Sequence, residues 1–100
     1  MKPRVWAPAA GGVDLEAGGV LRPMRPEPGG WFAIDEDLAP GTAYRFVLDG
    51  GPSLPDPRSR WQPDGVDGPS RVDDPSAFAW TDAGWRGVEQ DDLVIYELHI

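Results

Sequence analysis

The sequence contains no cysteine and only one histidine, His99. Without thiols the chain can form neither a disulfide framework nor a thiolate zinc site. A single histidine also leaves Ser59 and Ser70 without a base for nucleophilic catalysis. We therefore expect no metal, no cofactor and no serine-type active site.

Long apolar runs and excess positive charge are missing as well. No run approaches the roughly 20 residues of a membrane-spanning helix, and Met1-Lys2-Pro3 leads into no signal-peptide core. The formal net charge is -8, whereas nucleic acids and anionic membranes attract clustered lysine and arginine. We expect a cytoplasmic protein with no nucleic-acid and no membrane partner.

Helical periodicity is the third missing feature, and no helix of ordinary length is predicted. Glycine and proline, 13 and 12 residues, place the chain at the edge of low complexity, but five tryptophans are unusual for a disordered segment. Short strands separated by turn signals every 8 to 12 residues or so are typical of an antiparallel β-sandwich. The sequence therefore predicts an all-β domain.

The predicted strands show different degrees of burial. Pro8 and Pro23 place the strands beside them at sheet edges, because proline donates no ladder hydrogen bond. Residues 42–49 have the clearest period of two, with Tyr44 and Phe46 on one face, so they predict a central strand. In chain order the predicted strands are 4–7, 13–16, 20–24, 31–34, 42–49, 71–74 and 77–80.

The stretch from Leu54 to Ser70 holds four prolines, two glycines and three aspartates, so it is neither a helix nor a central strand. A loop of this length in a compact domain is functional, packed against a neighbour or disordered. It also carries Arg58, Arg60 and Trp61, which a solvated linker has little reason to hold together. We expect the arginines to pair with loop aspartates or with another domain.

The last eight residues, Leu93 to Ile100, form a nearly continuous apolar run. Such a run is typical of a strand buried on both faces of a parallel sheet. Because the run has no following helix and no partner, we expect the natural chain to continue past Ile100. On its own the segment is expected to be disordered, to pair with another chain or to aggregate.

Several motifs, taken in order, resemble a known family. They are Arg4 to Pro8, Val13 to Leu15, Gly30 to Phe32 and Gly41 to Gly50. Together they resemble the N-terminal early-set, immunoglobulin-like domain of the α-amylase superfamily, glycoside hydrolase family 13, which is related to carbohydrate-binding module 48.

The long loop narrows the resemblance. Residues 55–70, followed by 78–82 and 85–87, are similar to the malto-oligosyltrehalose trehalohydrolase family, although that family commonly has histidine where this chain has Asp67. Leu93 to Ile100 resembles the first strand of that family's TIM-type catalytic barrel. The resemblance implies an immunoglobulin-like domain over residues 1–87 and the start of a truncated barrel over 88–100.

The family resemblance also implies a function. Such a glycosidase hydrolyses the α-1,4 bond next to the trehalose end of maltooligosyl-trehalose, a step of trehalose biosynthesis, using two carboxylates. In the family both carboxylates lie on later barrel strands, so this chain is expected to contain no catalytic residue and to be inactive alone. Its expected partner is its own catalytic barrel. The alternatives are a stand-alone α-glucan-binding module, or the same domain from a glycogen branching or debranching enzyme.

Five tryptophans invite a sugar-stacking role, but a small sandwich also uses tryptophan to fill its core. Strand positions predict core burial for Trp6, Trp31 and Trp80. Loop positions predict interdomain packing for Trp61 and Trp85, together with Arg58 and Arg60, and sugar stacking is the alternative for the two tryptophans.

Two further patterns of titratable residues resemble sites. Glu97 and His99 point to the same side of one strand and could form an acid–base pair or half a metal site, but two ligands do not make a site. Asp73-Asp74 and Asp91-Asp92 lack calcium-loop spacing and are predicted to be solvated turns.

Overall fold

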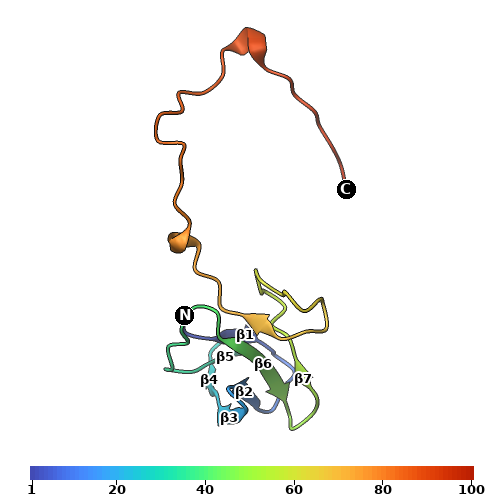
Figure 1. Ribbon diagram of the computed structural model, residues 1–100. Helices are drawn as coiled ribbons and strands as arrows, with labels where there is room; N and C mark the ends of the chain where they lie inside the picture. The colour runs from blue at the N-terminus through green and yellow to red at the C-terminus, as the bar shows by residue number, and fades with distance from the viewer.

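In the computed structural model, which describes residues 1–100, two antiparallel sheets face each other and the chain after Val72 extends away from them (Figure 1). The smaller sheet has the order β1-β5-β4, and the larger has β3-β2-β6-β7 with β8 also paired to β6. Their bounds are Arg4–Trp6, Val13–Ala17, Val20–Pro23, Arg25–Glu27, Trp31–Ala33, Ala43–Leu48, Ser53–Leu54 and Ser70–Arg71 for β1 to β8. The predicted all-β, immunoglobulin-like sandwich is confirmed.

The hairpin of β2 and β3 shows how the sequence sets the register. Gly18 and Gly19 both have positive φ, 61° and 74°, as a two-residue primed turn requires. The turn brings Ala17 opposite Val20 and fixes every later pair of the hairpin. Alternate residues of β2 are consequently buried, as its period of two predicts.

Strand β6 is central, as predicted. It pairs with β2 along one edge and with β7 and β8 along the other. Its inward residues Tyr44 and Phe46 are 3% and 1% exposed, and their rings meet edge to face with centroids 5.8 Å apart. Leu15 of β2 lies directly opposite Phe46 in the register and is fully buried.

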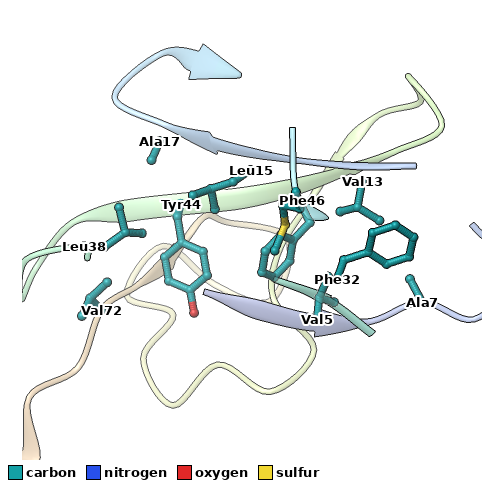
Figure 2. Packing of buried hydrophobic residues seen from close by; sticks show 11 residues of the cluster. Val5, Ala7, Val13, Leu15, Ala17, Phe32, Leu38, Tyr44, Phe46 and Val72 are labelled. Carbon is teal, nitrogen blue, oxygen red and sulfur yellow. The ribbon is translucent and has the colours of Figure 1, made fainter. Parts of the chain in front are cut away.

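The core lies between the sheets, where Val5 and Phe32 of the smaller sheet face Leu15 and Phe46 of the larger one (Figure 2). Eleven buried side chains form one cluster: Val5, Ala7, Val13, Leu15, Ala17, Met24, Phe32, Leu38, Tyr44, Phe46 and Val72. Leu38 and Val72 come from outside the strands, so the segments that close the ends of the sandwich also contribute to its core.

The strands beside Pro8 and Pro23 lie at sheet edges, as predicted, since β1 and β3 each pair with one strand only. Two strands were not predicted from the sequence. Strand β4 contains Pro26, which is tolerated because β4 is an edge strand, and β7 is only two residues long. Strands this short carry too little periodicity to be recognised.

The core prediction for Trp6, Trp31 and Trp80 is wrong. Trp6 is 57% exposed and Trp80 is 74% exposed, while Trp31 is half-buried and lies outside the core cluster, because Phe32 takes the inward position of β5. Val5 of β1 and Ala7 just after the strand face inward, so alternation directs Trp6 outward. Trp80 lies in the part of the chain that leaves the sandwich.

Residues 73–100 are all exposed, and every hydrogen bond that involves residues 75–100 stays within the segment from Asp74 onward. The segment contains two 3-10 turns, η1 (Pro75–Ala77) and η2 (Gln90–Asp92), neither long or apolar enough to cross a membrane. The radius of gyration is 18.7 Å, against roughly 13 Å for a compact chain of 100 residues. We call residues 73–100 the tail.

The predicted strands at 77–80 and 93–100 are not formed in the tail. A strand needs a neighbour for its backbone groups, and nothing in this chain pairs with either segment. The packed part of the chain ends at Val72, and the domain boundary after Gly87 stays a prediction.

The loop from Leu54 to Ser70 folds back on the sandwich through an aspartate. The Tyr44 hydroxyl donates to Asp56 Oδ2 at 2.7 Å, and the backbone N–H of Asp56 donates to the buried Ser70 Oγ at 2.9 Å. Asp56 therefore joins the start of the loop to its end and to β6. Burial, and then the hydrogen bond to the Asp56 carboxylate, raise the pKa of Tyr44 well above its usual value.

Replacing Phe46 with alanine is expected to destabilise the chain by about 3–5 kcal/mol, because a fully buried ring is lost and a cavity remains. The matched change Phe78→Ala, at a ring 63% exposed in the tail, is expected to stay within about 0.5 kcal/mol. Urea denaturation of both variants measures the two free energies. Equal losses would contradict the division between sandwich and tail.

Tyr44→Phe is expected to lower the free energy of unfolding by about 1–2 kcal/mol at neutral pH, because Asp56 loses its hydroxyl donor. Because the pKa of Tyr44 is higher in the folded chain than in the unfolded one, its full contribution to the free energy of unfolding is present below about pH 10. That contribution is lost as the pH rises further. The wild-type chain should therefore lose more stability than Tyr44→Phe above pH 10. Tyr96→Phe, at an exposed ring, is the control, and a wild-type loss no larger than that of Tyr44→Phe would refute the role of Tyr44.

Candidate functional site

The loop is fixed along its length. Arg45 of β6 donates to the backbone oxygens of Ser53 and Asp67, both at 3.1 Å, and the N–H of Arg71 donates to the Trp61 oxygen at 3.0 Å. Arg58 N–H donates to Asp56 Oδ1 at 2.8 Å, which turns the chain just after Asp56. Of the three possibilities open to a long loop, the structure thus shows packing against the sandwich, and the side chains that this loop presents have defined positions.

Three arginines converge on a pocket of about 250 Å3 at this loop. Arg58, Arg60 and Arg71 line it together with Asp56 and Asp73. Arg71 lies 3.7 Å from the Asp64 carboxylate and 5.9 Å from the Trp61 ring, so it links Trp61 to the pocket. We call the surface formed by Arg58, Arg60, Trp61, Arg71 and Asp73 the exit face, because the tail leaves the sandwich there.

The expected pairing of Arg58 and Arg60 with loop aspartates is not found. Neither guanidinium has a carboxylate within 4.0 Å, and Arg71 takes the Asp64 carboxylate instead. The Arg58 guanidinium lies 5.8 Å from the Trp31 ring. Both arginines are exposed, so the exit face presents two cations without an anionic partner on a chain of net charge -8.

The structure brings three of the four predicted site residues together. Arg58 and Arg60 line the pocket, and Trp61, which is 41% exposed, joins it through Arg71. Trp85 lies apart in the tail and is 71% exposed; its backbone N–H donates to the Asp82 oxygen at 2.8 Å.

A second exposed aromatic surface was missed from the sequence. Trp6 and Trp31 are directly opposite in the register of β1 and β5, and the Arg4 guanidinium lies 4.4 Å from the Trp31 ring. The Arg4 side chain also pairs with Glu27 of β4 at 3.1 Å. The signal was present, because Val5 and Ala7 flank Trp6 with smaller apolar side chains that suit the inward positions of a strand.

Glu97 and His99 lie close together, with 3.6 Å between Oε1 and Nε2, although the strand predicted to place them on one side is not formed. Both side chains are more than four-fifths exposed. No group of three potential metal ligands is formed in the chain. An exposed pair in water has no third group to orient it, so this geometry provides neither a metal site nor a desolvated acid–base pair.

The chain was compared with known proteins. No protein-family model matches it. Proteins called malto-oligosyltrehalose trehalohydrolase are 47% identical in Rhizobium sp. strain M-11, covering 96% of this chain, and 41% identical in Deinococcus radiodurans, covering 97%. A 1,4-α-glucan branching enzyme of Rhizobium johnstonii is 34% identical over 96% of the chain.

The structural comparison agrees. A crystal structure of a Salmonella typhimurium protein described as an α-amylase superposes with a TM-score of 0.80 and 40% identity, covering 87% of this chain and 15% of that one. The chain spans about one sixth of the length of the curated relatives, and it matches their N-terminal region. By its sequence and its fold, the chain belongs to the malto-oligosyltrehalose trehalohydrolase family of the α-amylase superfamily, as part of its N-terminal region.

Proposed function

We propose that this chain is the non-catalytic N-terminal module of a cytoplasmic glycosidase that hydrolyses the α-1,4 bond next to the trehalose end of maltooligosyl-trehalose. The observation that carries this proposal is the identity of 38–47% to seven trehalohydrolases, each over nearly the whole chain. The identity to the branching enzyme is lower, at 34%. Trehalose is the product that this proposal implies.

The module's role in such an enzyme is to pack on the catalytic domain. Glycoside hydrolysis needs two carboxylates placed on either side of the scissile bond. We assign both to the catalytic barrel, beyond the residues of this chain, and no residue of the module takes part in bond cleavage. By holding the barrel at a fixed surface, the module helps to shape the substrate cleft.

The exit face is the surface that we assign to this contact. Val72 is the last buried residue, and the next residue, Asp73, lines the same pocket as Arg58 and Arg60. A polypeptide that follows the sandwich therefore begins beside the loop, at the end of the sandwich where the orange segment leaves in Figure 1. The two arginines suit carboxylates of the catalytic domain, because a guanidinium binds a carboxylate through two parallel hydrogen bonds.

The tail supplies a second, apolar part of the contact. Val94, Ile95 and Tyr96 are each more than four-fifths exposed, and Trp85 is 71% exposed. A contiguous apolar segment in water is unfavourable and marks a surface that another element covers. We assign residues 93–100 to the first strand of the barrel and Trp61 and Trp85 to the packing around it.

Two alternatives remain within the same fold. A branching or debranching enzyme would use the same module, in line with the weaker match to the branching enzyme. A stand-alone α-glucan-binding module would use its exposed tryptophans directly.

The product of the complete gene is expected to release trehalose from maltooligosyl-trehalose, while the 100-residue chain releases none. Chromatography of the sugars after incubation with each protein measures this. New α-1,6 branches in amylose, with no trehalose from either protein, would contradict the proposal in favour of a branching enzyme.

The double change Arg58→Ala, Arg60→Ala is expected to destabilise the complete gene product by about 2 kcal/mol or more, because buried charge pairs at an interface lose one partner. In the 100-residue chain the same change should stay within about 0.5 kcal/mol, since neither arginine has an ion-pair partner there. Thermal and urea unfolding of both proteins provide the measurement. Lys2→Ala, outside the exit face, is the control, and an equal effect of the double change in both proteins would argue against the interface.

A further inference from the structure

The outer edge of β1 has backbone groups without partners. The N–H of Ala7 donates to the Gly30 oxygen at 2.9 Å, which continues the register between β1 and β5. Because bonded and non-bonded pairs alternate along an antiparallel ladder, the N–H and C=O groups of Arg4 and Trp6 point away from β5. Strand β1 pairs with no other strand, so this edge can accept one more.

An apolar groove of about 200 Å3 lies beside this edge, between β1 and β7. Its walls include Trp6 and Leu54, which are 57% and 44% exposed, and Leu48 of β6. Pro55 and Pro57 add a further apolar wall at the start of the loop. No charged residue lines the groove, so the occupant that it suits is an apolar side chain.

The end of the tail has a matching pattern of side chains. Successive residues of an extended chain point to opposite sides, and the even-numbered positions of 93–100 are all apolar and at least 65% exposed: Val94, Tyr96, Leu98 and Ile100. The other side carries the polar residues Glu97 and His99. A strand with one wholly apolar side suits the open edge of a sandwich, where only that side becomes covered.

The tail does not occupy the groove of its own chain. Asp74 Oδ1 accepts the N–H of Ser76 at 3.0 Å, and Pro75 restricts the backbone at the same turn, so the start of the tail has a defined direction. From residue 75 onward no hydrogen bond joins the tail to the sandwich, and the tail leads away from it in Figure 1. Residues 93–100 are therefore available to a second chain.

We propose that residues 93–100 of one chain add as a strand to the free edge of β1 in a second copy of this chain, with their even-numbered side chains over the apolar groove. Each copy has one such strand and one such groove, so the exchange is reciprocal and gives a closed two-fold dimer. Backbone hydrogen bonds supply the pairing, and the groove selects the apolar side of the strand. Neither the groove nor the strand depends on the proposed glycosidase function.

The contact area is sufficient for a dimer. At about 100 Å2 for an aliphatic side chain and about 150 Å2 for an aromatic one, the four even-numbered side chains bury roughly 450 Å2. With a similar area lost by the receiving edge, two contacts bury roughly 1,800 Å2, within the roughly 1,200–2,000 Å2 of stable interfaces. The charge of -8 on each chain opposes association. We expect a Kd of about 100 μM at low salt and tighter association at high salt, which screens the repulsion.

The test is the oligomeric state of the 100-residue chain, measured by analytical ultracentrifugation from roughly 5 μM to roughly 1 mM at low and at high salt. A monomer with an unpaired tail is expected at the lowest concentration, and a dimer that salt strengthens at the highest.

Tyr96→Lys is expected to weaken association at least about tenfold, because it places a charge over the apolar groove. The matched change Ile95→Lys, on the opposite side of the strand, should leave association within about twofold. Both residues lie in the tail, so neither change disturbs the sandwich. In the groove, Leu54→Arg should weaken association as much as Tyr96→Lys, whereas Val66→Arg, at a position 81% exposed in the loop, should not.

A monomer at every concentration and salt would overturn the proposal. Equal effects of Tyr96→Lys and Ile95→Lys would overturn the one-sided docking of the strand. Association that survives Leu54→Arg would place the contact between two tails and overturn the groove as the receiving surface. A monomer with nuclear Overhauser contacts between Tyr96 and Leu54 would show that the tail folds back on its own groove, which would also overturn the exchange. Trehalose release by the complete gene product is measured separately, so the proposed function and the dimer can fail independently.

Discussion

The pairing of β6 with its neighbours is the interaction on which the rest of the structure depends. Its backbone is bonded to β2 on one side and to β7 and β8 on the other, so it is the only strand that connects both ends of the long loop. Its inward side chains, Tyr44 and Phe46, belong to the core, and the Tyr44 hydroxyl donates a hydrogen bond to Asp56 in the loop. Removal of β6 would therefore disrupt the core, the loop and the exit face at the same time.

The two sheets provide hydrogen-bond partners only for the backbone groups of the strands that they contain. The tail lies beyond the sheets and has no such partners. Up to Val72 the strands pair with one another and bury a common core, but beyond Asp73 the chain has apolar side chains and no neighbour. The same physics that buries Leu15 leaves Ile95 in water, because burial depends on a partner and not on hydrophobicity alone. This contrast supports the proposal that the tail packs on a catalytic domain.

Much of the fold follows from local chemistry in the sequence. The Gly18-Gly19 turn, the alternation of Val13, Leu15 and Ala17, and the period of β6 each act within a few residues, so they were readable. The position of Trp80 could not be predicted, since it depends on which part of the chain has a partner. The outward orientation of Trp6 could have been, because Val5 and Ala7 on either side of it suit the inward positions. Similarly, the sequence showed that Arg58, Arg60 and Trp61 belong to one loop, but only the structure places Asp73 beside them and leaves Trp85 apart.

The central claim is that the exit face and the tail are one contact surface for a catalytic domain. Hydrogen–deuterium exchange of backbone amides, compared between the 100-residue chain and the complete gene product, tests it most directly. The account predicts that amides of residues 93–100 exchange rapidly in the short chain and become protected in the complete protein, together with those of residues 58–61. Equal exchange of residues 58–61 and 93–100 in both proteins would contradict it.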